Sequence, residues 1–173
     1  KILRIRGDAM QNAVPNGEGG MVAVLGSNVD TIEKILKANK DNFKAQIAND
    51  NSDSQIVLSG KNSDLESLIT VLKLKTIKNI KLPVSAPFHC SLMNKATEIM
   101  KKEIEKTNFT NSENILISNV TGKEISNKNE LKKLLIEQIE NRVRWRESVL
   151  NMIENGVNHF IEMGPGKVLS GLI

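Results

Sequence analysis

Apolar and polar residues follow one another between Gly17 and Pro83 in a way that predicts four strands and two helices. In the second of these helices, Leu65, Leu68 and Leu72 share one face. The resulting order, β-α-β-β-α-β, is the split pattern of ferredoxin-like folds. The expected strands lie at 21–25, 44–49, 55–59 and 76–84, and the expected helices at 30–38 and from 62 or 63 through 72.

Outside this unit the pattern changes to longer helices separated by short apolar runs. Helices are expected at 1–14, 91–107, 129–140 and 145–154, strands at 115–120 and 159–163, and a last helix after the turn GPGK. Helices that alternate with buried strands imply a parallel sheet. We therefore expect an α/β fold in which residues 17–83 form a small ferredoxin-like subdomain, inserted into a larger α/β core of residues 1–16 and 84–173.

The composition is that of an ordinary globular domain with an aliphatic core. Apolar residues make up 39% of the chain and charged residues 25%, whereas aromatic residues reach only 3% and tyrosine is absent. The net charge of +4 comes from basic residues interleaved with acidic ones, as in MKKEIEKT, which is typical of solvated helix faces. This charge is also compatible with an anionic substrate or an acidic partner protein.

Several classes of function are excluded by what the chain does not contain. RNA-recognition domains share the β-α-β-β-α-β order but stack bases on aromatic side chains of their central strands. Here these strands read MVAVL and QIVLS, without one aromatic residue, which argues against nucleic-acid recognition. No apolar run approaches the ~18 residues of a membrane span, and no signal peptide is visible. Two histidines and one cysteine at unrelated positions form no metal-ligand cluster, and the single cysteine suits a reducing compartment such as the cytoplasm.

His89 is the side chain best placed for chemistry. It follows the sequence VSAPF, in which Pro87 forces Ala86 into an extended conformation, so the imidazole lies on a rigid loop just before a helix. This loop also stands at the junction of the two expected units, where clefts are common. A histidine that caps the helix, or is hydrogen-bonded in the core, remains the alternative. A dyad with Cys90 is not expected, because neighbours at a helix start point away from one another; Cys90 reads as a small buried side chain. His159 begins a predicted strand, where a structural role is expected.

Three other polar residues carry little signal by themselves. Arg6 lies in IRGDAMQ, and a guanidinium can hold a carboxylate through two parallel hydrogen bonds, but an isolated arginine on a helix reads as a surface residue. Gln138 similarly reads as an exposed polar residue of a helix, and Asn51 as a turn residue. The glycine-rich MGPGKVLSG lacks the spacing of a phosphate-binding loop and reads as a tight turn.

Taken together, five segments of the chain resemble one family, the malonyl-CoA:acyl-carrier-protein transacylases of fatty-acid synthesis. The segments are RGDAMQNAVPNGEGGMVAVLG, NDNSDSQIVLSG, LPVSAPFHCSLM, QIENRVRW and FIEMGPGKVLSGL, in the order of the family and close to its spacing. The resemblance covers essentially the whole chain. It implies an α/β-hydrolase-like core with an inserted ferredoxin-like subdomain, which agrees with the layout read from the residues.

The resemblance also implies a role for each candidate residue. In the family a serine attacks the malonyl thioester, a histidine matched by His89 takes its proton, and the phosphopantetheine thiol of acyl carrier protein then accepts the malonyl group in a ping-pong reaction. Arg6 matches the arginine that pairs with the malonyl carboxylate, and Gln138 matches the position whose backbone carbonyl orients the histidine. Asn51 matches an asparagine near the catalytic cleft, and Phe88 a bulky residue that leaves little room for an α-methyl group. Malonyl-CoA is then the substrate and acyl carrier protein the partner, with no bound cofactor or metal.

The chain departs from the family in having neither the GQGxQ loop nor the GHSxG nucleophile elbow. Both of its ends look cut, since Lys1 stands inside a helical pattern and KVLSGLI ends without a stop signal. We therefore expect a fragment that transfers no malonyl group by itself, because the nucleophile and the oxyanion hole are missing. Its remaining strands would expose apolar edges, which favours self-association or pairing with a partner.

Two alternatives stay open at this point. One is a non-catalytic module that binds acyl carrier protein, although such a module has no physical need for Arg6, His89 and Gln138 together. The other is the acyltransferase domain of a polyketide synthase. No flanking domains or linkers of such a synthase are visible, and the close match to the free-standing enzyme also argues against it.

Overall fold

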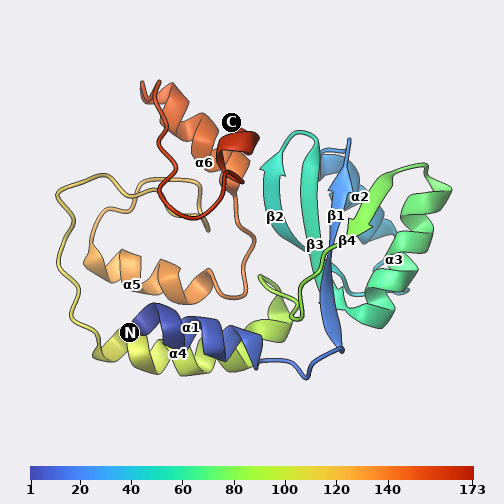
Figure 1. Cartoon of the computed structure of the whole chain (residues 1–173), viewed down its shortest axis with the longest axis horizontal. Coiled ribbons are helices and arrows are strands. Elements are labelled where there is room, and N and C mark those ends of the chain that lie inside the picture. Colours follow the sequence, from blue (N-terminus) through green and yellow to red (C-terminus); the bar gives the residue numbers. More distant parts are fainter.

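The computed structural model describes residues 1–173 as a mixed α/β structure with two regions of different construction (Figure 1). A four-stranded sheet and its helices lie on one side, and the remaining helices with their long loops lie on the other. We call residues 17–83 the sheet unit and residues 1–16 and 84–173 the helical region. None of the helices is long and apolar enough to cross a membrane.

The sheet unit has the element order β-α-β-β-α-β, as predicted, with boundaries that differ by a few residues. All of its paired strands are antiparallel, and their order across the sheet is β2-β3-β1-β4. Its elements are β1 (Gly19–Leu25), α2 (Val29–Ala38), β2 (Gln46–Ser52), β3 (Gln55–Lys61), α3 (Asn62–Leu74) and β4 (Lys78–Lys81).

The aliphatic core lies between one face of the sheet and the helices α2 and α3. Side chains alternate between the two faces of a strand, so every second residue of β1 and β3 points into this core. The other face carries a small cluster of Met21, Ala23, Ala48 and Val57, against which Phe88 packs. The main core comprises Val22, Val24, Ile32, Ile35, Phe43, Ala45, Ile56, Leu58, Leu65, Leu68 and Leu72.

The helical region is built mainly on two helices that lie side by side, the first and the fourth of the chain (Figure 1). Their apolar faces meet in a second cluster, the helical cluster, which consists of Ala9, Met10, Ala13, Met93, Ala96, Met100, Ile104 and Ile139. The predicted helix at 91–107 begins with a separate 3-10 turn. The elements of this region are α1 (Ile2–Gln11), η1 (Ser91–Met93), α4 (Asn94–Lys106), α5 (Lys128–Glu137), α6 (Trp145–Glu154) and η2 (Ser170–Leu172).

Two predicted strands, and the parallel sheet expected from them, are absent. The segment 115–120 has only an isolated bridge between Ile117 and Glu124, and 159–163 has no paired strand. A strand forms only where its N–H and C=O groups pair with a neighbour, and neither segment has a neighbouring strand. Their apolar side chains are consequently exposed, as Ile115 and Ile161 are at 71% and 74%. The predicted last helix is reduced to the single turn η2.

Candidate functional site

The segment 84–90 crosses from the sheet unit to the helical region and is held against β1 by close packing. Ala86 and Pro87 are buried. Pro87 lies so near Gly19 that a Cβ atom at Gly19 would come within 2.4 Å of the proline ring, so only glycine leaves room for this contact. Cys90 is buried, as predicted, and its Sγ–H donates to the carbonyl of Pro87 at 3.1 Å. The loop that carries His89 is therefore fixed on both sides of the histidine.

His89 itself has a left-handed backbone conformation, with φ of 57°. For a residue other than glycine this conformation costs about 1–2 kcal/mol and persists only where the surroundings impose it. Here they do, because Phe88 packs against both the helical cluster and the cluster under the sheet, while Cys90 is buried. Strained backbone of this kind gathers at functional sites, which adds a reason to single out His89.

A single hydrogen bond fixes the protonation of the His89 ring. Its Nδ1 atom lies 2.8 Å from the backbone carbonyl oxygen of Gln138. Because a carbonyl oxygen can only accept, Nδ1 carries the proton and Nε2 keeps its lone pair. Burial lowers the pKa of His89 below its ordinary 6.5, the Gln138 hydrogen bond raises it, and the charge of Arg6 lowers it. The net direction is downward, so the imidazole is neutral near pH 7 and can accept a proton at Nε2.

The carbonyl of Gln138 is available to His89 because it stands at the end of α5. The last carbonyl groups of a helix have no partner within the helix, and the helix dipole makes this end partially negative. Ile139, next in the chain, is fully buried in the helical cluster and anchors this end. A histidine that becomes positively charged here is stabilised, which is what a base requires while it holds a proton.

Arg6, on α1, supplies the positive charge that acts on His89. Its side chain is half-buried and forms no ion pair with an acidic residue, and burial lowers the pKa of its guanidinium. The group stays charged, because the ordinary pKa of arginine is far above neutrality. A half-buried guanidinium without a carboxylate partner is suited to bind an anion, with two parallel hydrogen bonds where the anion is a carboxylate.

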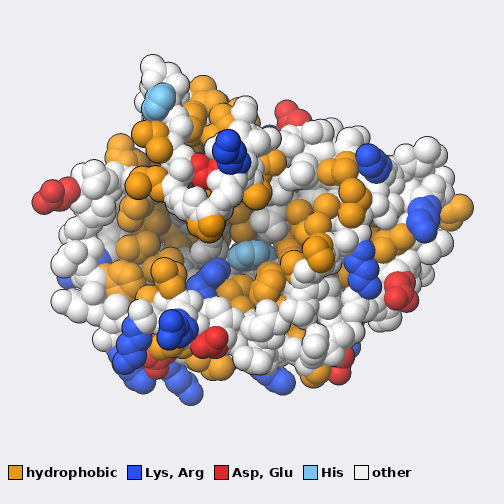
Figure 2. All heavy atoms as spheres, in the orientation of Figure 1, with side chains coloured by type: hydrophobic (Ala, Val, Ile, Leu, Met, Phe, Trp, Pro, Cys, Tyr) orange, Lys and Arg blue, Asp and Glu red, His pale blue; other side chains and the backbone are white.

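One face of the molecule is hollowed in its middle. Figure 2 shows a histidine side chain on the floor of this hollow, with a basic side chain beside it and apolar side chains around it. His89 and Arg6 are both half-buried, so each keeps part of its side chain exposed.

Asn51 and Phe88 make other contacts in the structure. The Nδ2 atom of Asn51 donates to Oε1 of Gln55 at 2.9 Å within the β2–β3 hairpin. This hydrogen bond gives the side-chain amide of Asn51 a partner inside the hairpin. The half-buried ring of Phe88 packs between the helical cluster and the cluster under the sheet. The structure thus gives each of them a structural contact, and their roles beside a substrate stay predictions.

Asp50 and Arg146, which sequence patterns did not single out, form an ion pair between the sheet unit and the helical region. Asp50 is fully buried in β2 and accepts three hydrogen bonds from the guanidinium of Arg146 on α6, at 2.9 to 3.2 Å. The available signal was weak: Asp50 follows the apolar Ala48 at a spacing of two and so shares its inward face.

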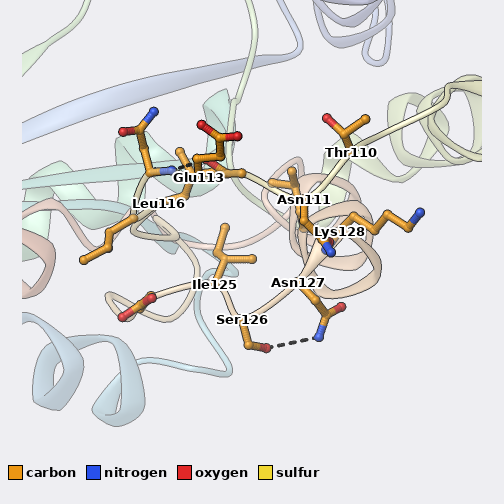
Figure 3. A pocket seen from close by; sticks show the side chains of 13 residues that line it. Thr110, Asn111, Glu113, Leu116, Ile125, Ser126, Asn127 and Lys128 are labelled. Atoms are coloured by element: carbon orange, nitrogen blue, oxygen red, sulfur yellow. Dashed lines mark hydrogen bonds between the residues drawn. The ribbon is translucent and has the colours of Figure 1, made fainter.

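A separate hollow of about 130 Å³ lies between the loop after α4 and the segment that leads into α5 (Figure 3). Some of its polar groups bind one another, since the amide of Lys128 donates to Asn111 Oδ1 and the amide of Asn114 donates to Ser112 Oγ. The functional candidates do not line it, and we assign no chemistry to it. No group of three or more His, Cys, Asp or Glu side chains is placed to hold a metal ion.

The fold and the site together define a class: a mixed α/β protein with a neutral histidine poised for proton transfer beside an arginine suited to an anionic substrate. Comparison with known proteins shows which proteins the chain resembles. The chain is 39% identical over 173 residues to malonyl CoA-acyl carrier protein transacylase of Bacillus subtilis strain 168, covering 99% of this chain and 55% of that protein. It is 35% identical over 173 residues to the protein of the same name in Escherichia coli K12, covering 99% of this chain and 56% of that one.

Solved structures give the same result. The crystal structure of malonyl CoA-acyl carrier protein transacylase from Clostridium perfringens superimposes with a TM-score of 0.95 at 39% identity, over 99% of this chain and 54% of that one. No family profile matches the chain. The chain is therefore similar along its whole length to malonyl CoA-acyl carrier protein transacylases, and it spans about half the length of the curated relatives it matches.

Proposed function

We propose that this chain is part of an enzyme that transfers a malonyl group from malonyl-CoA to the phosphopantetheine thiol of acyl carrier protein, a step of fatty-acid synthesis. The observation that carries the proposal is the 2.8 Å hydrogen bond between His89 Nδ1 and the Gln138 carbonyl, which leaves Nε2 free near the unpaired Arg6. Homology to malonyl CoA-acyl carrier protein transacylases supports it.

His89 is the general base in this proposal. A serine hydroxyl loses its proton to Nε2 while its oxygen attacks the thioester carbonyl of malonyl-CoA; the C–S bond then breaks, and His89 returns the proton to the departing CoA thiolate. In the second half, the phosphopantetheine thiol gives its proton to Nε2 and attacks the malonyl ester, and the serine oxygen leaves with that proton. The carbonyl of Gln138 holds Nδ1–H throughout and stabilises the imidazolium. The serine is supplied from outside these 173 residues, which contain no GHSxG motif.

Arg6 provides the preference for an acid-bearing acyl group. Its guanidinium would hold the malonyl carboxylate through two parallel hydrogen bonds. An acetyl group would leave this half-buried charge unpaired, which is unfavourable. Phe88, immediately before the base, would limit the space for an α-methyl group on the substrate, and Asn51 would lie near the edge of the cleft.

The proposal extends to the architecture. Residues 17–83, with their β-α-β-β-α-β order, would be a ferredoxin-like subdomain, and residues 1–16 and 84–173 would be part of an α/β-hydrolase-like core. In such a core the segments 115–120 and 159–163 would pair with strands from outside this chain. The exposure of Ile115 and Ile161 supports this view. The same exposed residues favour self-association of the isolated chain.

A chimeric enzyme tests the proposed function. This chain would replace the matching portion of the Bacillus subtilis relative, and malonyl transfer from malonyl-CoA to acyl carrier protein would be measured. We expect the chimera to be active, and His89→Ala to lower its kcat by roughly 10²–10⁴-fold, the usual contribution of a positioned base. Arg6→Ala should raise the KM for malonyl-CoA. It should also lower the ratio of kcat/KM for malonyl-CoA to kcat/KM for acetyl-CoA.

The chain offers a matched control for Arg6. Arg4 is an exposed arginine on the same helix, so Arg4→Ala should leave transfer unchanged. A chimera that folds but transfers nothing, or in which Arg4→Ala costs as much as Arg6→Ala, would overturn the proposal. An inactive chimera that still bound acyl carrier protein would favour the non-catalytic module instead.

A further inference from the structure

The ion pair between Asp50 and Arg146 joins the two regions of the molecule, with a buried carboxylate and a partly buried guanidinium. Asp50 is 0% exposed in β2 of the sheet unit, and Arg146 lies in the first turn of α6 in the helical region. Arg146 donates from Nε to Oδ1 at 3.1 Å and from Nη2 to Oδ2 at 2.9 Å, the forked geometry that a lysine cannot copy. The exposed Asp53 adds a looser contact at 3.5 Å.

The backbone makes a second connection at the same place. The amide of Asp50 donates to the carbonyl of Val143 at 2.9 Å, and the amide of Val143 donates to the carbonyl of Ala48 at 2.7 Å. Val143 thus forms a short parallel bridge on the edge of β2. The side chains of Asp50 and Arg146 bind the next turn of the chain to the same strand.

This anchored point ends the short connection that contains Gln138. The connection runs from the end of α5 at Glu137 to the start of α6 at Trp145. Near its beginning Ile139 is buried in the helical cluster, and near its end Val143 and Arg146 are bound to β2. The position of the Gln138 carbonyl is therefore set from both regions.

We propose that Asp50 and Arg146 are positioning residues: their pair holds the connection 138–145 on β2, so that the Gln138 carbonyl stays on Nδ1 of His89. The inference deepens the proposed function, because it concerns the base of the same site. A buried ion pair is often no more stabilising than an apolar pair of the same size, so its presence here fits a geometric role better than a stabilising one.

Nuclear magnetic resonance of the 173-residue chain with ¹⁵N-labelled histidine tests this directly, since it reports the tautomer and the pKa of each histidine without requiring transfer activity. The double variant Asp50→Leu/Arg146→Met removes both charges at once and so leaves no buried charge unpaired. Arg146→Lys is a milder second variant, which keeps a charge beside Asp50 but loses the fork. The control is Arg142→Met, which removes the ion pair between Arg142 of the same connection and the exposed Glu33 of α2, a link to the sheet unit that does not involve β2.

In the double variant, the share of His89 with its proton on Nδ1 should fall, and the pKa of His89 should fall further below 6.5, because the Gln138 hydrogen bond is what raises it. Arg146→Lys should shift both readouts in the same direction by less. Arg142→Met should match the parent in both readouts.

Two outcomes overturn the inference. One is an unchanged tautomer and pKa of His89 in the folded double variant or, where that variant does not fold, in Arg146→Lys. The other is an equal shift in Arg142→Met, which would mean that any ion pair on the connection acts alike. If the shifts appear while the chimeric enzyme transfers no malonyl group, the proposed function fails and the positioning role stands.

Discussion

The sheet unit and the helical region differ in how completely they bury their apolar side chains. In the sheet unit, only Leu74 and Ile80 are large apolar residues left exposed, and the core between the sheet and its helices is closed. The helical region has a smaller cluster and leaves many more such residues on its surface. They are Leu3, Val84, Ile99, Ile115, Leu116, Leu150, Ile153, Val157, Ile161, Met163, Val168, Leu169 and Ile173.

Both regions hold the candidate site in place. His89 and Gln138 belong to the helical region, where Phe88 and Ile139 next to them pack in the helical cluster. From the sheet unit, Gly19 makes room for the proline before His89, and β2 anchors the connection that follows Gln138. The well-packed unit therefore contributes to fixing two loops that lie outside it.

The largest expected effect is the difference in stability between removing a buried apolar side chain from the sheet unit and removing an exposed one from the helical region. Leu68 is fully buried in the sheet unit, so Leu68→Ala should lower the free energy of unfolding by about 2–5 kcal/mol. Ile161 is 74% exposed, and Ile161→Ala should change it by less than about 0.5 kcal/mol. Urea unfolding followed by circular dichroism measures both, and equal costs would show that the exposed face is covered in solution.

Each region has one helix that begins with an asparagine cap, so the two regions can be compared by the same substitution. Asn28 caps α2 of the sheet unit by accepting from the amide of Thr31, and Asn127 caps α5 of the helical region by accepting from the amides of Asn129 and Glu130. Replacing either asparagine by alanine should cost about 1 kcal/mol locally.

Hydrogen exchange of the backbone amides shows which elements are destabilised by each substitution. Asn28→Ala should speed exchange throughout the sheet unit, whereas Asn127→Ala should speed it in α5 and leave β1 and β3 as protected as before. Faster exchange in β1 and β3 upon Asn127→Ala would show that the two regions open as one unit.

The same contrast explains which features the sequence could predict. The β-α-β-β-α-β order and the helix at 145–154 follow from local patterns. All four strands of the sheet lie within residues 17–83, so each expected strand has its neighbour in the same unit. The predictions of strands at 115–120 and 159–163 were wrong for this chain, because a strand also needs a neighbouring strand to pair with and neither segment has one.

The sequence likewise predicted one part of the candidate site and not the others. The loop rigidity that singled out His89 is visible in the local sequence, but its pairing with Gln138 was expected only through the family resemblance. The ion pair of Asp50 and Arg146 joins residues 96 positions apart and leaves no periodic trace in the sequence. Contacts of this kind are decided by the tertiary fold, which local patterns do not contain.

The smallest expected effect is on the pH dependence of stability. Burial lowers the pKa of His89, so the unfolded chain takes up a proton near the ordinary 6.5 while the folded chain does so only at lower pH. In that window the unfolded state binds more protons, and stability therefore falls as the pH falls through it. His89→Asn removes the titration while keeping an amide that can donate to the Gln138 carbonyl. Urea midpoints between about pH 5.5 and 7.5 should then depend less on pH than in the parent. A full dependence in His89→Asn would contradict a buried, neutral His89.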